Sequence, residues 1–174
     1  YTFHLNPNAL WHDGTPVTAQ DVAFTVSLMK SEHQLIPEDL RKFWSEIEVD
    51  VVLDTVIEFA LPEAFAPFLD YLSFQVLPVH LLGNLSVDQL VDHPFNLAPV
   101  GSGPYKFSKF LVEDGVVTGV DLVANADFYG GRPYIDEVVF QYYPSEVQAW
   151  TAYQAGEVDG LSAISNDILP EVLA

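Results

Sequence analysis

Cysteine is absent from this chain of 174 residues, so the chain can form neither a disulfide bond nor a thiolate metal site. Basic residues are scarce, because 6 lysines and arginines stand against 25 aspartates and glutamates, for a formal net charge of -19. Such a charge repels the phosphates of nucleic acids and anionic lipid headgroups. We therefore expect neither nucleic acid nor a membrane surface among the partners of this chain.

Long hydrophobic runs are also missing. The longest uncharged stretch, residues 71–87, is interrupted by Pro78, His80 and Gly83 and is shorter than the roughly 20 apolar residues that a membrane-spanning helix needs. The first residues, YTFHL, alternate like a strand and lack the basic start and apolar middle of a signal peptide. We expect no membrane span, and we expect the chain to begin inside a sheet, as an excised piece would.

Motifs for metal, cofactor and catalytic sites are absent as well. The five histidines form neither an HExxH motif nor a close pair on one helix face (His4, His12, His33, His80 and His93). The stretch VGSGPY lacks the third glycine of a dinucleotide-binding fingerprint, which would fall at Phe107. No serine or cysteine nucleophile is identifiable by motif. We expect no metal site, no cofactor and no catalytic residue.

What the chain does contain predicts a folded domain of mixed α/β class. Apolar residues make up 49% and aromatic residues 13% of the chain, which is too rich for a disordered protein. Alternating and helical periodicities predict strands at 1–5, 105–112, 117–124, 137–143 and 160–163, a hairpin over 45–60, and helices at 19–30, 63–72, 77–91 and 145–156. Ser86 is expected to cap a helix that ends at Val91, and residues 93–103 are expected to form a loop.

The stretch WHDGTPVTAQDVAFTV, residues 11–26, combines an aromatic side chain, a histidine and a carboxylate with a turn and a helix start. Asp13 and Gly14 are typical of a turn, and Thr18 with Asp21 has the spacing of a helix-capping pair. His12 and Asp13 are adjacent on an extended segment, so their side chains should point apart. We interpret this stretch as structural, with Trp11 packed against its surroundings.

Two further features allow a functional and a structural interpretation. Glu46, Glu48 and Asp50 form a carboxylate row that could serve a glycosidase or a cation, but their spacing of two indicates the solvated face of a strand. In AGEVDG, Gly156 is expected to end a helix before the short apolar segment LSAIS. Ligands of open α/β sheets bind beside strand ends, so this segment is either part of a site or a plain connection.

Several stretches together resemble the bacterial extracellular solute-binding proteins of family 5, which serve oligopeptide and dipeptide ABC transporters. The stretches are YTFHL with WHDGTPVTAQDVAFTV, VLPVHLL, PVGSGPYKF, NADFYGGRPYIDEVVFQYYP and AYQAGEVDG, and they occur in the order typical of the family. The resemblance covers nearly the whole chain. Its structural signature comprises Trp11, Asp13, Gly14, Thr18, Asp21, Gly101 and Gly103.

The resemblance implies a periplasmic-binding-protein-like fold of type II, of which this chain is an incomplete first lobe. Residues 1–96 would form a β-rich accessory subdomain, and residues 97–174 would form part of the main sheet of that lobe. The second lobe of the parent chain would close over the ligand. By resemblance, the ligand contacts of this lobe fall on Leu161, Ser162 and Ala163.

The function implied by this resemblance is non-catalytic capture of peptides for an ABC importer. The partners would be a peptide or another small solute, the membrane permease and the second lobe. The parent would be periplasmic or extracellular and anchored to the membrane. Three alternatives remain open: another cargo such as an oligosaccharide, a nickel chelate or haem; a hydrolase that uses the carboxylate row; and a structural interaction domain.

Overall fold

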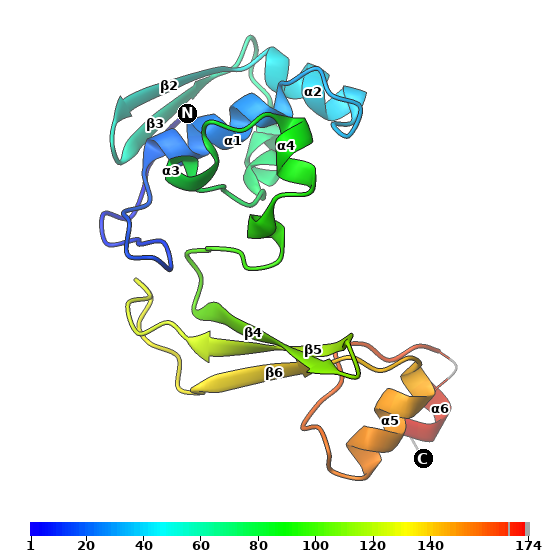
Figure 1. Cartoon of the computed structure of the whole chain (residues 1–174). Coiled ribbons are helices and arrows are strands. Elements are labelled where there is room, and N and C mark those ends of the chain that lie inside the picture. The colour runs from blue at the N-terminus through cyan, green and yellow to red at the C-terminus, as the bar shows by residue number, and fades with distance from the viewer. Residues whose placement is uncertain (167, 173–174) are drawn as a thin grey trace. The chain divides into compact units, whose positions relative to one another are not determined.

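The computed structural model describes residues 1–166 and 168–172, and the chain divides into two compact units (Figure 1). Unit 1 comprises residues 1–106 together with residues 124–134. Unit 2 comprises residues 107–123 and the chain from residue 135 onward. Each unit contains both helices and strands, so the expected mixed α/β class is confirmed.

Unit 1 is built on a sheet of three strands in the order β1-β3-β2, namely β1 (Thr2–His4), β3 (Val56–Ala60) and β2 (Glu48–Leu53). Both pairings are antiparallel, and β2 with β3 forms the predicted hairpin. The side chains of Ile57 and Phe59 are buried, while Glu48, Asp50 and Glu58 face solvent. The predicted solvated strand face is therefore confirmed for Glu48 and Asp50, whereas Glu46 lies before β2, at the end of the preceding helix.

Helix α1 (Ala19–Met29) packs against this sheet through one apolar stripe. Val22 and Val26 are buried and belong to the core cluster, and Met29 packs beside them. The helix begins at Thr18, whose backbone N–H donates to the Asp21 carboxylate at 2.7 Å. The predicted helix and its capping pair are therefore confirmed.

Helix α2 (Glu38–Ser45) supplies the centre of the core, although the sequence patterns did not predict it. Its only buried side chain is Trp44, which is fully buried and contacts the rings of Phe43, Phe59, Phe68 and Phe74. Leu40, Phe43 and Trp44 have the i, i+3, i+4 spacing of a helix, and Leu40 and Phe43 pack on the core beside Trp44, so a short helical pattern was present and was missed. Aromatic packing around Trp44 holds it in place.

Short helical turns complete unit 1, and the predicted short helices are confirmed. They are the 3-10 helices η1 (Ala66–Leu72) and η2 (Pro94–Asn96) and the α-helices α3 (Val79–Leu82) and α4 (Val87–Val91). Ser86 caps α4 as expected, because its hydroxyl accepts from the backbone N–H of Gln89 at 3.4 Å. The expected loop over residues 93–103 thus contains one additional helical turn, η2.

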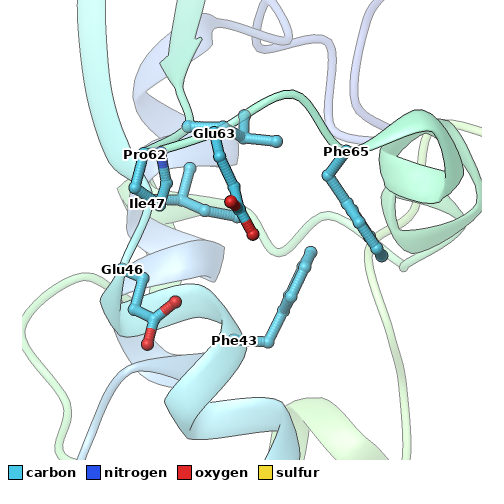
Figure 2. A pocket seen from close by; sticks show the side chains of 7 residues that line it. Phe43, Glu46, Ile47, Pro62, Glu63 and Phe65 are labelled. Atoms are coloured by element: carbon cyan, nitrogen blue, oxygen red, sulfur yellow. The ribbon is translucent and has the colours of Figure 1, made fainter.

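A pocket opens where the end of α2 meets the chain that follows β3 (Figure 2). Its volume is about 130 Å³, and its lining combines aromatic and aliphatic side chains with two carboxylates: Phe43, Glu46, Ile47, Leu61, Pro62, Glu63 and Phe65. Figure 2 shows the Glu63 carboxylate projecting toward the space beside the rings of Phe43 and Phe65.

A second sheet has the order β4-β5-β6, with β4 (Tyr105–Glu113), β5 (Val116–Ala124) and β6 (Glu137–Gln141). All of its residues except Tyr105, Lys106 and Ala124 belong to unit 2. Asp114 and Gly115 join β4 to β5 with φ of 50° and 79°, the backbone that a two-residue hairpin turn of type I′ requires. Two helices follow, α5 (Glu146–Gln154) and α6 (Leu169–Val172). The strands predicted at residues 105–112, 117–124 and 137–143 and the helix predicted over residues 145–156 are confirmed.

Candidate functional site

Helix α5 ends in a tight turn that leads into the segment expected to touch a ligand. Gly156 adopts φ of 72°, and its N–H donates to the Tyr153 carbonyl at 3.0 Å. The N–H of Glu157 donates to the Ala152 carbonyl at 2.9 Å, which completes a Schellman C-cap. Only glycine adopts this backbone without strain, so the prediction that Gly156 ends the helix is confirmed.

Leu161, Ser162 and Ala163 follow this turn as an exposed, irregular segment. Leu161 is half-buried, and Ser162 and Ala163 are exposed. The strand predicted over residues 160–163 was wrong, because these residues form no strand. A strand requires a hydrogen-bonded neighbour, and none of the described residues pairs with this segment. No backbone hydrogen bond joins residues 161–163 to any other described residue.

The far end of this segment is fixed to the first turn of α5. The backbone N–H of Ser165 donates to the Glu146 carboxylate. Hydrogen bonds from the Ser165 side chain and backbone lower the pKa of Glu146, which therefore stays ionised in mildly acidic solution. Residues 157–164 thus span between two anchors on the same helix, the C-cap of α5 and Glu146.

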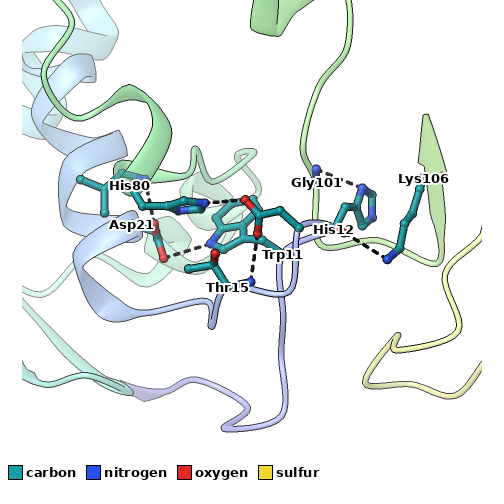
Figure 3. Close-up of polar contacts among 9 residues, drawn as sticks. Trp11, His12, Thr15, Asp21, His80, Gly101 and Lys106 are labelled. Carbon is teal, nitrogen blue, oxygen red and sulfur yellow. Dashed lines mark hydrogen bonds and ion pairs between the residues drawn. The ribbon is translucent and has the colours of Figure 1, made fainter. Parts of the chain in front are cut away.

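A second group of candidate residues gathers around Asp21 in unit 1 (Figure 3). The Asp21 carboxylate is buried and accepts four hydrogen bonds: from Trp11 Nε1 at 3.3 Å, Thr18 N at 2.7 Å, Thr18 Oγ1 at 3.1 Å and Val79 N at 2.8 Å. Four donors replace the water that a buried carboxylate loses. Trp11 is buried as expected, and its indole N–H contributes to this network.

Asp13 forms a turn and also pairs with a distant histidine. Its Oδ1 accepts from the backbone N–H of Thr15 at 2.9 Å, and Gly14 follows with φ of 89°. Its Oδ2 accepts from His80 Nε2 at 2.7 Å. Burial raises the pKa of Asp13, but the hydrogen bonds from His80 and Thr15 outweigh this effect and leave the pKa below its ordinary value.

His12 points away from Asp13, as expected for neighbours on an extended segment, and binds the chain around Gly101. The N–H of Gly101 donates to His12 Nδ1 at 3.1 Å, and His12 Nε2 donates to the Gly103 carbonyl at 3.0 Å. This arrangement requires the neutral ring, because Nδ1 accepts a hydrogen bond. Burial first, and then the charge of Lys106, lower the pKa of His12 below its ordinary value.

The seven signature residues therefore belong to one hydrogen-bonded corner of unit 1. Sequence reasoning missed His80, Val79 and Lys106, whose ammonium donates to the His12 carbonyl at 3.1 Å. The two glycines differ: a Cβ on Gly101 would lie 3.2 Å from the His12 ring, whereas a Cβ on Gly103 would meet nothing within 4 Å. A side chain at position 101 would thus press on the His12 ring, and Gly103 contributes its carbonyl.

Residues 1–166 and 168–172 contain neither a cluster of metal-ligating side chains nor a helix that could span a membrane. No three histidine, aspartate or glutamate side chains in these ranges lie close enough together to hold a metal ion. No helix in the same ranges has the length and apolar character needed to cross a membrane.

The whole chain, residues 1–174, matches the family model described as bacterial extracellular solute-binding proteins, family 5. It is 30% identical to the oligopeptide-binding protein AppA of Bacillus subtilis over 173 residues, which cover 96% of this chain and 30% of AppA. The chain thus spans about 30% of the length of the relatives that it matches.

Solved structures agree with this match. The structure of AppA from Bacillus subtilis in complex with a nonapeptide has a TM-score of 0.78 and 30% identity, with 91% of this chain and 31% of AppA covered. NikZ from Campylobacter jejuni in complex with Ni(L-His) has a TM-score of 0.76 and 28% identity, with 91% of this chain and 31% of NikZ covered. From its sequence and its fold, this chain belongs to the bacterial extracellular solute-binding proteins of family 5.

Proposed function

We propose that this chain is part of the first lobe of a receptor that captures oligopeptides or dipeptides and delivers them to the permease of an ABC importer. The fold would be of type II, with residues 1–96 as accessory subdomain and residues 97–174 as part of the main sheet. The receptor would act in the periplasm or outside the cell and be anchored to the membrane through the parent chain. Its second lobe would close over the ligand.

The observation that carries this proposal is the exposed backbone of Leu161–Ala163. These residues lie between two anchors on α5, yet their N–H and C=O groups have no partner among the described residues. An extended peptide binds to such groups through its own main chain, which gives affinity that is independent of the peptide sequence. The relationship to AppA, whose structure holds a nonapeptide, supports a peptide as the ligand.

Identification of the bound cargo tests the proposed ligand class. The full-length receptor that contains this chain is expressed and purified gently, and the co-purified small molecules are identified by mass spectrometry. We expect a mixture of peptides. A single sugar, nickel complex or haem would overturn the peptide assignment.

A pair of substitutions at Ser162 tests the backbone contact in the full-length receptor. S162P removes one N–H, and we expect peptide affinity to fall about tenfold, as for one lost hydrogen bond. S162A keeps the N–H and should bind within about twofold of the unmodified receptor. Equal losses for both variants would assign the contact to the hydroxyl group, and no loss for either would remove Ser162 from the site.

A nickel chelate is the second candidate cargo. NikZ, whose structure holds Ni(L-His), shares 28% identity with this chain, close to the value for AppA. A metal bound as a complex with a small chelator needs few protein ligands. The lack of a cluster of metal-ligating side chains among the described residues therefore does not separate the two candidates. Two titrations of the full-length receptor, one with nickel and histidine and one with a peptide library, discriminate between the two candidate cargoes.

A further inference from the structure

The pocket beside α2 in unit 1 has a composition that the proposed function does not use. One wall is aromatic: the rings of Phe43 and Phe65 have centroids 5.7 Å apart and a tilt of 59°, and Tyr71 stacks on Phe43 with centroids 4.1 Å apart. Ile47, Leu61 and Pro62 add aliphatic surface. The lining therefore favours an apolar body that enters the pocket.

The lining of this pocket includes two carboxylates and no basic side chain. Glu46 and Glu63 line it and are exposed, and neither carboxylate has an ion pair among the described residues. The Lys42 ammonium lies 4.0 Å from Glu38, and the Lys30 ammonium donates to the carbonyl of the lining residue Ile47 at 2.6 Å without pairing with either pocket carboxylate. In a chain of net charge -19, these carboxylates add to a potential that attracts cations.

We infer that this pocket binds an organic cation, namely an alkylammonium or alkylguanidinium group. Aromatic rings attract such cations through their electron-rich faces, and the alkyl stem covers the aliphatic surface. The two carboxylates neutralise the charge, and a volume of about 130 Å³ suits a single cationic group on a short stem. The inference goes beyond the proposed function, since its residues all belong to unit 1 and do not include Leu161–Ala163.

The inference is tested on the whole chain by two-dimensional NMR titration with n-butylammonium at constant ionic strength. We expect saturable shifts of the amide signals of Phe43, Ile47 and Phe65, with an affinity on the order of millimolar for a site this exposed. n-Butanol, which has the same stem without the charge, should cause no saturable shift. Shifts spread over all acidic surfaces, or equal shifts with n-butanol, would overturn the inference.

Matched variants separate the pocket from the general acidity of the chain. E46Q/E63Q removes both pocket carboxylates, and we expect the affinity to fall about two- to fivefold for each charge removed. E113Q/E137Q changes the net charge by the same amount at exposed carboxylates outside the pocket and should leave the affinity unchanged. Equal effects of the two double variants would show diffuse attraction and contradict the inference.

The source of the cation is distinguished by a second ligand. An acetylated and amidated tripeptide, Ala-Lys-Ala, presents the same ammonium group from a polypeptide. Tighter binding of this peptide than of n-butylammonium would assign the pocket to a basic side chain of a protein partner. Tighter binding of n-butylammonium would assign it to a free amine. Failure of both ligands to bind would reject the site without affecting the proposal for Leu161–Ala163.

Discussion

At the scale of single residues, the carboxylate of Asp21 joins segments that are far apart in the sequence. It accepts hydrogen bonds from Trp11 before helix α1, from Thr18 at the start of α1 and from Val79 at the start of α3. No described ion pair involves Asp21, so hydrogen-bond donors and the positive end of α1 stabilise its charge. Its removal leaves buried donors without acceptors.

Replacement of Asp21 by alanine should therefore destabilise unit 1. We expect D21A to lower the free energy of unfolding by about 3 kcal/mol, since hydrogen bonds to a buried charge are costly to lose. Urea unfolding followed by tryptophan fluorescence measures the effect, because Trp11 and Trp44 are both buried in unit 1. D92A, at an exposed aspartate, is the control and should change the free energy by less than about 0.5 kcal/mol.

His12 makes the corner around Gly101 sensitive to acid. Its pKa in the folded chain lies below the ordinary value, mainly through burial, so the unfolded chain binds the proton more readily. The stabilisation by neutral His12 is thus complete above about pH 6.5 and is lost as the pH falls through the folded pKa. Protonation also removes the acceptor that Nδ1 offers to the Gly101 N–H.

We expect the stability of unit 1 to fall more steeply between pH 7.5 and about pH 5 in the unmodified chain than in H12Q. Urea unfolding at a series of pH values measures both slopes, and their difference isolates His12 from His33 and His80, which pair with Asp88 and Asp13. Parallel pH profiles would show that His12 contributes nothing to the acid sensitivity.

At the scale of elements, Gly119 decides how closely β5 and β6 pair. A Cβ at Gly119 would lie 2.6 Å from the Phe140 carbonyl oxygen, which is a backbone atom of β6 and cannot turn aside. Gly119 faces Gln141 in the register of this antiparallel pair. The pairing therefore depends on the absence of a side chain at this position.

Replacement of Gly119 by alanine should loosen β6 without affecting unit 1. We expect the amides of β6 to exchange with deuterium at least about tenfold faster in G119A, because the strand must move or lose its hydrogen bonds. G160A is the control within unit 2, since a Cβ on Gly160 would meet nothing within 4 Å. Unchanged exchange of β6 in G119A would contradict the close approach.

Elements were predicted where their own pattern is strong and missed where packing decides. Helix α1 has a continuous apolar stripe, and the hairpin of β2 and β3 alternates clearly, so both were found. Helix α2 is an exception, because Leu40, Phe43 and Trp44 have helical spacing and the helix was nevertheless not predicted. The apolar segment at 160–163 resembles a strand in sequence, yet no described neighbour pairs with it.

At the scale of the whole molecule, the two units differ in how much apolar surface they bury. Unit 1 surrounds Trp44 and Phe68 with a continuous cluster that includes α1 and the sheet. In unit 2, Trp150, Ala152 and Ile168 are the buried apolar side chains among the described residues, whereas Val139 and Phe140 on β6 are about half exposed. Apolar surface of this kind is typical of a face that another part of a protein covers.

This difference predicts unequal stability within the chain. We expect amides of α1 and β3 to be protected from hydrogen exchange at least about tenfold more strongly than those of β6 and α5, because fewer buried contacts resist local opening in unit 2. Mass spectrometry of deuterated peptides measures both regions in one sample. Equal protection of the two units would show that unit 2 is stabilised by more than its buried side chains.

The isolated chain should also bind peptides poorly, in keeping with the proposed function. We expect no calorimetric binding tighter than about 1 mM, because a ligand held between two lobes gains only half of its contacts from one of them. Micromolar binding to the isolated chain would contradict the proposed division between lobes.

The sequence by itself determined the class of the fold, the start of α1 after Thr18 and the end of α5 before Gly156, because periodicity, caps and turn residues act over a few neighbouring positions. The family followed from the resemblance of several long stretches. Only the tertiary structure decided that Asp13 pairs with His80, that His12 binds Gly101 and Gly103, and that Leu161–Ala163 stays unpaired. The histidine contacts join residues 67 to 91 positions apart, and the third feature depends on the absence of a neighbouring strand among the described residues. Local patterns carry no information about such distant contacts.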